Sequence, residues 1–230
     1  MIIAKKCLSL AKRKETMEEV RILDITNITE EEVNAQLALL PAWRREKALQ
    51  YKHFQGRKEC VVSFLLLKEA VLNENEDENE NYFFEFRQND RMTCFLRNED
   101  EDENELEFEY GEHGKPVLKG RPDIHFNISH CKKAVACVVA DKPVGIDIEC
   151  LGRYKESLAK AVLSDEEMMV VRQADEPDKA FTILWTKKEA LLKCLGTGVS
   201  SDMKNVLAEH KDKKITTTVC DGYVYSVCTE

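Results

Sequence analysis

The chain has 230 residues, of which 43% are hydrophobic and 33% charged, a mixture that can bury one sizeable core or two small ones. Its formal net charge of −9 argues, on first reading, against nucleic acid or any other phosphate-rich partner. The acidity is uneven, because residues 74–109 hold 15 acidic and only 3 basic residues. From the net charge of the whole chain we expect no nucleic-acid partner. The rest of the chain has a net charge of +3, so it could still bind a smaller anion.

The nine cysteines are odd in number and form no C-x-x-C pair, which disfavours both a disulfide framework and a zinc site. They are typical of reduced thiols in the cytoplasm. No run reaches the roughly 18 apolar residues of a membrane span. The charges of Lys5 and Lys6 follow too few apolar residues for a signal peptide. We interpret residues 1–16 as a tail, with Met17 as an alternative start, and expect a cytoplasmic protein without a membrane anchor.

The first third of the chain predicts a strand followed by three helices. The strand is expected over 20–25, and Thr29 with Glu32 forms a capping box for the first helix. A second helix follows Pro41, and a third is expected over 57–72.

Two acidic, low-complexity runs, 73–81 and 99–105, cannot bury a core and are expected to be solvated loops. They lack the Asp-x-Asp-x-Asp-Gly order of a calcium loop. Between them, 82–86 and 92–96 predict a short strand pair. We treat 73–109 as an acidic insert whose deletion should leave the chemistry of the protein intact.

After Gly111 the pattern changes to strands. Residues 123–129 and 144–149 alternate between apolar and polar side chains, while 134–140 is continuously apolar. The remaining predicted elements are a helix capped by Ser164 and Glu167, a long helix from Asp178 to Gly196, and a hairpin of 215–219 and 223–227. Because strands and helices do not alternate regularly, the pattern predicts an α+β fold.

The strand over 144–149 places two carboxylates on one face, since strand side chains alternate with a period of two. Asp147 and Glu149 share that face, and a divalent cation such as Mg²⁺ would relieve their repulsion. Gly145 would let a ligand or another backbone approach closely. Taken alone, the pattern is also typical of a solvated strand face.

Some 40 residues later, Trp185, Glu189 and Lys193 follow one another at intervals of four and lie along one helix face. A Glu–Lys pair at this spacing is also ordinary surface chemistry, and Trp185 fits core packing better than a substrate contact. The combination of this helix with the carboxylate strand is more informative than either motif alone.

At this point the sequence resembles the Sfp-type 4′-phosphopantetheinyl transferases. The family signatures G-x-D-x-E and W-x-x-K-E-A-x-x-K stand complete at 145–149 and 185–193. Phe126-Asn127-Ile128-Ser129-His130 matches the family's strand-end Ser-His, and Gly114-Lys115-Pro116 matches its upstream turn. The order and spacing agree from about residue 40 to residue 200.

The resemblance implies an enzyme that moves the phosphopantetheine arm of coenzyme A onto a serine of an acyl or peptidyl carrier protein and releases adenosine 3′,5′-bisphosphate. It implies two similar α+β halves, 17–141 and 142–230, related by a pseudo-twofold axis. Each half would be a small, mostly antiparallel sheet with helices, and the substrate cleft would lie between them. A monomer would be sufficient. The boundary would fall near Asp141-Lys142-Pro143.

The resemblance also implies the site residues. Mg²⁺, with Mn²⁺ as an alternative, would be held by Asp147, Glu149 and Glu189. Coenzyme A would be contacted by Arg44, Lys47, Lys115, Ser129, His130, Lys188 and Lys193. Arg44 stands where the family often has Lys, and Cys131 stands where Ser is usual.

Attack of a serine hydroxyl on a phosphoanhydride needs a proton acceptor and stabilisation of the leaving phosphate, for which we assign Glu189 and Lys193. Two other readings stay open: a magnesium-dependent diphosphate hydrolase, and a non-enzymatic relative that binds carrier proteins or coenzyme A. An acidic carrier protein would dock on basic and apolar residues after Glu149. The candidates are Arg153, Lys155, Lys160, Met168, Met169 and Arg172.

Overall fold

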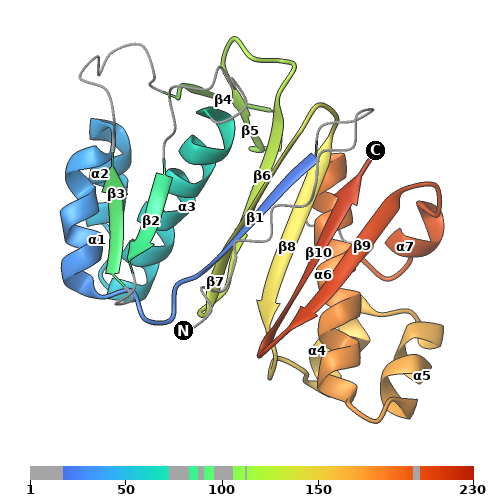
Figure 1. The fold of residues 1–230 in the computed structure, drawn as a ribbon. Helices are drawn as coiled ribbons and strands as arrows, with labels where there is room; N and C mark the ends of the chain where they lie inside the picture. The colour runs from blue at the N-terminus through green and yellow to red at the C-terminus, as the bar shows by residue number, and fades with distance from the viewer. Residues whose placement is uncertain (1–17, 73–82, 88–90, 96–105, 112, 199–202) are drawn as a thin grey trace.

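The computed structural model describes residues 18–72, 83–87, 91–95, 106–111, 113–198 and 203–230, with the backbone alone at 83–87 and 91–95. The predicted tail over 1–16 and the two acidic runs lie outside the described residues. The described chain forms two antiparallel three-stranded sheets, each with helices on its outer side (Figure 1).

The first sheet has the strand order β1-β7-β6. Its strands are β1 (Glu18–Asp24), β6 (His125–His130) and β7 (Ala134–Ala140). The accompanying helices are α1 (Glu30–Gln36), the 3₁₀ turn η1 (Leu37–Leu39), α2 (Ala42–Leu49) and α3 (Phe54–Leu72). Two short strand pairs belong to this part: β2 (Phe83–Arg87) with β3 (Arg91–Phe95), and β4 (Phe108–Tyr110) with β5 (Pro116–Leu118).

The second sheet has the strand order β8-β10-β9. Its strands are β8 (Val144–Cys150), β9 (Lys214–Cys220) and β10 (Tyr223–Thr229). Its helices are α4 (Glu156–Val162), α5 (Asp165–Gln173), α6 (Pro177–Leu195) and α7 (Val206–Glu209).

Strand β7 explains the layering, because it is buried on both faces. Its odd-numbered residues, such as Val135 and Val139, join the apolar cluster built with α3, while Ala136 and Val138 join a second cluster with β8 and β10. A continuous apolar strand is the expected solution for a position covered on both sides. The order of layers is therefore helices, sheet, sheet, helices (Figure 1).

The two sheets meet where β6 and β8 run side by side. Asn127 Oδ1 of β6 accepts a hydrogen bond from the Ile146 amide of β8 at 2.9 Å. Ser129 Oγ accepts one from the Ile148 amide at 3.3 Å. Side chains of β6 thus satisfy amide groups on the edge of β8 that a neighbouring strand would otherwise pair.

The α+β prediction is confirmed, and both predicted capping boxes are present, at Thr29 with Glu32 and at Ser164 with Glu167. The sequence reading missed α4, α7 and the β4–β5 pair. The symmetry of the two halves and their boundary near Asp141 stay predictions. None of the described helices combines the length and apolar character that crossing a membrane requires.

Candidate active site

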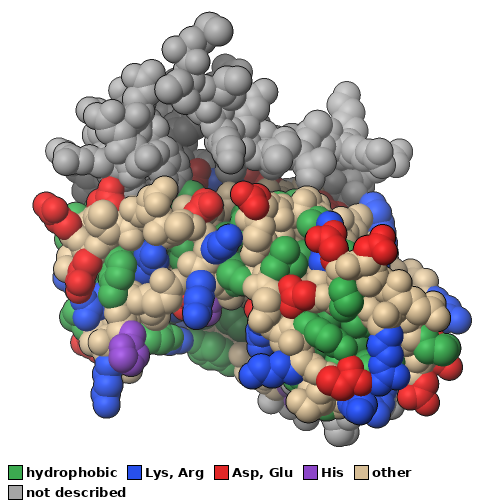
Figure 2. All heavy atoms as spheres, turned by 90° about the horizontal axis from the view of Figure 1, so that it is seen from below, with side chains coloured by type: hydrophobic (Ala, Val, Ile, Leu, Met, Phe, Trp, Pro, Cys, Tyr) green, Lys and Arg blue, Asp and Glu red, His purple; other side chains and the backbone are tan. Residues whose placement is uncertain are grey.

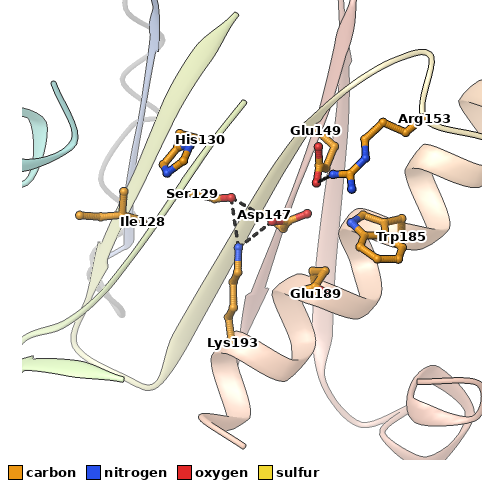
Figure 3. Close-up of a pocket in the computed structure, with 9 residues that line it drawn as sticks. All are labelled: Ile128, Ser129, His130, Asp147, Glu149, Arg153, Trp185, Glu189 and Lys193. Carbon is orange, nitrogen blue, oxygen red and sulfur yellow. Dashed lines mark hydrogen bonds and ion pairs between the residues drawn. The ribbon is translucent and has the colours of Figure 1, made fainter. Parts of the chain in front are cut away.

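Side chains from β6, β8, the following loop and α6 line one pocket at the junction of the two sheets (Figure 3). The lining residues are Ile128, Ser129, His130, Asp147, Glu149, Arg153, Trp185, Glu189 and Lys193. The structure therefore brings together six of the residues that the sequence assigned to the site.

Gly145 determines how closely α6 approaches β8. A Cβ atom built on Gly145 would lie 2.9 Å from the carbonyl carbon of Lys193, and closer still to backbone atoms of Ala190 and Cys194. The glycine therefore admits another backbone rather than a ligand, which settles the alternative that the sequence left open. Asp147 and Glu149 share one strand face, and because Gly145 on that face packs against α6, they point toward this helix (Figure 3).

Ser129, Asp147 and Lys193 form a hydrogen-bonded triad at the floor of the pocket. Lys193 Nζ lies 2.6 Å from Asp147 Oδ1 and donates to Ser129 Oγ at 3.1 Å. The Ser129 hydroxyl donates to the same Asp147 oxygen at 2.9 Å. Asp147 is buried while Lys193 remains partly exposed, so the lysine links the buried carboxylate to the open part of the pocket.

Glu149 and Glu189 carry carboxyl groups in an unfavourable setting for negative charge. The pKa of Glu189 is raised by burial and then by the negative charge of Asp147. The pKa of Glu149 is raised by burial, which the hydrogen bond from Arg153 offsets in part, and the negative charge of Asp147 raises it further. The pocket therefore concentrates negative charge beyond what its own cations neutralise, and a bound cation would relieve the repulsion.

His130 stands at the end of β6 and faces α3. Its Nδ1 lies 3.3 Å from Glu59 Oε2, and Gln55 Nε2 donates to the other oxygen of Glu59 at 2.8 Å. His130 is half exposed while Glu59 is largely covered. Glu59 thus orients the ring at the mouth of the pocket.

Lys115, which the sequence assigned to coenzyme A, contacts backbone carbonyl groups in the structure. It follows the β4–β5 turn, and its Nζ donates to the carbonyl oxygens of Val144 at 3.0 Å and Lys193 at 2.7 Å. Burial lowers its pKa. The lysine holds the start of β8 against the last turn of α6, and its contact with coenzyme A stays a prediction.

Lys188 also differs from the expectation that it faces phosphate groups. It is fully buried on the side of α6 away from the pocket. Its Nζ pairs with Glu167 at 2.8 Å and donates to the carbonyl oxygens of Met203 and Lys204. Adjacent helix residues point about 100° apart, and Lys188 is not among the residues that line the pocket with Glu189. We therefore assign Lys188 to the packing of α6.

Arg44 and Lys47 lie on α2 and do not line the pocket. Arg44 donates to the Cys60 carbonyl oxygen at 2.8 Å, and its guanidinium lies 5.6 Å from the centre of the Phe64 ring. Lys47 is exposed on the same helix. Their contact with a 3′-phosphate stays a prediction.

Arg153 is the pocket residue whose role sequence reasoning missed. It pairs with Glu149 and lies 5.4 Å from the centre of the Trp185 ring. Figure 3 shows its guanidinium directed at Glu149, above Trp185. The spacing of four residues from Glu149 was a signal for the pair, but the intervening residues leave the strand, so the contact depends on the path of the loop.

The donor set is suited to a hard divalent cation. Asp147 Oδ2 is buried and has no hydrogen-bond partner among the described residues, and Glu149 and Glu189 line the same pocket. Carboxylate oxygens are the ligands that Mg²⁺ prefers. In the described part of the chain, no three ligand-type side chains are already gathered at metal-binding distance. The chemistry therefore fits such a cation, provided that the carboxylates draw together around it.

Comparisons with known proteins point to one family. The model of the 4′-phosphopantetheinyl transferase superfamily matches residues 143–229, which include β8 and α6. A 4′-phosphopantetheinyl transferase of Bacillus subtilis is 28% identical over 184 residues, covering 79% of this chain and 71% of the relative. The transferase Sfp of Bacillus subtilis strain 168 is 24% identical over 199 residues, covering 85% and 78%. The L-aminoadipate-semialdehyde dehydrogenase-phosphopantetheinyl transferase of Saccharomyces cerevisiae is 36% identical over 109 residues, covering 43% and 40%.

Proposed function

We propose that the chain is an Sfp-type 4′-phosphopantetheinyl transferase, and that it transfers the 4′-phosphopantetheine arm of coenzyme A to a serine of an apo carrier protein. The observation that carries the proposal is the convergence of three carboxylates and Lys193 in one pocket at the β6–β8 junction. The reaction joins the serine oxygen to the phosphorus that carries the arm, breaks the anhydride bond to the nucleotide and releases adenosine 3′,5′-bisphosphate.

Two side chains of α6, Glu189 and Lys193, act on the proton of the serine and on the negative charge of the leaving phosphate. Glu189 accepts the proton of the attacking serine hydroxyl from its place in the same pocket as Lys193. Lys193 stabilises the negative charge on the leaving phosphate from a position fixed by Asp147 and Ser129. His130 and Ser129 line the pocket where the pyrophosphate would bind.

Asp147, Glu149 and Glu189 would hold Mg²⁺, with Mn²⁺ as an alternative. When bound, the cation supplies electrophilic stabilisation of the phosphate oxygens, a contribution worth several kcal/mol. Asp147 Oδ2 has no hydrogen-bond partner among the described residues and lies in one pocket with Glu149 and Glu189, which supports this assignment.

Intact-mass analysis of a carrier protein separates this function from the alternatives. We expect purified protein, Mg²⁺ and coenzyme A to convert an apo carrier to a species heavier by one phosphopantetheine arm. A hydrolase would consume coenzyme A while the carrier stays unmodified. A binding protein would leave both reactants unchanged, and either result would overturn the proposal.

The carrier would dock beside the pocket, on α4 and α5. Met168 is buried and is removed from the predicted set, whereas Met169 is 54% exposed and its neighbour Val170 is 59% exposed. Lys160 and Arg172 flank them as exposed cations paired with Glu156. Seen from below, this side of the molecule carries hydrophobic side chains surrounded by charged ones (Figure 2).

Charge reversal tests this surface. Lys160→Glu with Arg172→Glu should raise KM for an acidic carrier while leaving KM for coenzyme A unchanged, because neither residue lines the pocket. An unchanged carrier KM would place docking elsewhere. We further propose that the enzyme acts as a monomer in the cytoplasm, where its reduced thiols are stable.

A further inference from the structure

Arg153 forms an ion pair with Glu149, one of the three carboxylates that the proposed function assigns to a metal. Its Nη1 pairs with Glu149 Oε1, and the pKa of Arg153 is raised by that hydrogen bond. Asp147 and Glu189 line the same pocket, and Figure 3 shows the guanidinium directed at Glu149.

The loop that carries Arg153 is firmly anchored. The amides on either side of it, those of Gly152 and Tyr154, donate to the two carboxylate oxygens of Asp178 at 2.6 and 2.9 Å. Trp185 supplies a ring face 5.4 Å from the guanidinium carbon. A cation–π contact and a charge-assisted hydrogen bond together position the Arg153 side chain toward Glu149.

Resting on the proposed function, we propose that Arg153 is a resident counter-ion that competes with the divalent cation for Glu149. With Arg153 in place, Glu149 is neutralised by the protein itself, and Lys193 does the same for one oxygen of Asp147. A cation held by the Glu149 carboxylate would meet the like charge of the guanidinium beside it, so the two cations would compete for the same negative charge. Arg153 is thus a positioning residue that weakens metal binding in the absence of substrate.

Metal titration tests the competition without relying on activity. Mn²⁺ binding to the coenzyme A-free protein can be followed by electron paramagnetic resonance of the free ion, in the wild type and in Arg153→Gln. We expect Arg153→Gln to bind Mn²⁺ about three- to tenfold more tightly, because it loses both a competing ion pair and a repelling charge. Loss of a merely structural contact would weaken binding instead.

Arg121→Gln is the matched control. Arg121 pairs with Asp123 outside the pocket, and its side chain is 40% exposed, against 47% for Arg153. Its Mn²⁺ affinity should equal that of the wild type. Asp147→Asn removes a proposed ligand and should weaken binding in any case.

The outcomes separate the inference from the proposed function. Equal or weaker Mn²⁺ binding by a folded Arg153→Gln variant, with weaker binding by Asp147→Asn, would overturn the competition and leave the metal site standing. If neither the wild type nor Arg153→Gln binds Mn²⁺, the metal assignment fails and the inference fails with it.

Discussion

At the scale of single residues, Asp147 is the centre of the site. One of its oxygens accepts from Ser129 and pairs with Lys193, while the other is buried without a partner among the described residues. A buried unpaired carboxylate oxygen is costly and calls for a functional reason. Binding of a cation gives that reason, and the paired oxygen fixes Lys193 for its role toward phosphate.

Replacing Lys193 should affect catalysis more than binding. Lys193→Met removes the charge that stabilises the leaving phosphate, so we expect kcat to fall by roughly 100-fold or more. Lys187→Met, on the same helix but outside the pocket, is the matched control and should retain wild-type rates. A Lys193→Met variant with normal kcat at saturating Mg²⁺ would remove Lys193 from the mechanism.

The sequence indicated which residues belong to the site, but it predicted only in part where their side chains point. Strand periodicity correctly placed Asp147 and Glu149 together, because neighbouring strand residues point to opposite faces. The roles of Lys115 and Lys188 could not be foreseen, since the length of a lysine side chain lets it reach either a ligand or a backbone carbonyl. Only the three-dimensional course of the 203–204 segment and of α6 shows that both lysines are already engaged.

At the scale of elements, α6 uses one face to line the pocket and another to pack against the protein interior. One face carries Trp185, Glu189 and Lys193 into the pocket, and the opposite side buries Lys188 against Glu167. Close contact with β8 at Gly145 holds the helix at the distance that these side chains require. The elements α7 and β4–β5 escaped prediction because three or four residues give too little periodicity. The helix α4 escaped it because Lys155 at its N-cap offers no capping side chain.

Lys115 should contribute to stability through the end of α6. Lys115→Met would leave the carbonyl oxygens of Val144 and Lys193 without their buried donor, at a cost of about 1–3 kcal/mol in the free energy of unfolding. Lys119→Met, in an exposed position at the base of the same hairpin, is the control and should unfold like the wild type. Urea denaturation measures both, and equal midpoints for the two variants would contradict this role.

At the scale of the whole molecule, the site depends on the junction of the two three-stranded sheets. Ser129 belongs to the first sheet and Asp147 to the second, and the same Ser129 hydroxyl contacts both the Ile148 amide and Lys193. The contact between the two sheets and the position of Lys193 in the pocket therefore depend on the same hydroxyl group. The sequence motifs indicated which segments take part, but not that side chains of β6 satisfy the edge of β8.

The stability of the first sheet should depend on pH through Glu69. Burial outweighs the attraction of Arg21, 2.8 Å away, and raises the pKa of Glu69 to about 7 from its ordinary value of 4.5. Between these values the folded chain binds more protons than the unfolded chain, so this group lowers stability as the pH rises. From pH 5 to pH 8 we expect the wild type to lose about 2 kcal/mol more unfolding free energy than Glu69→Gln. Parallel pH profiles for the two proteins would contradict the shift.

The central claim is that the pocket at the β6–β8 junction transfers the phosphopantetheine arm, and intact-mass measurement of one carrier protein with matched enzymes tests it most directly. Wild-type enzyme with Mg²⁺ and coenzyme A should convert the apo carrier fully. Asp147→Asn, verified as folded by circular dichroism, should leave it unmodified over the same time. A carrier left unmodified by the wild type, or modified equally by both enzymes, would contradict the account.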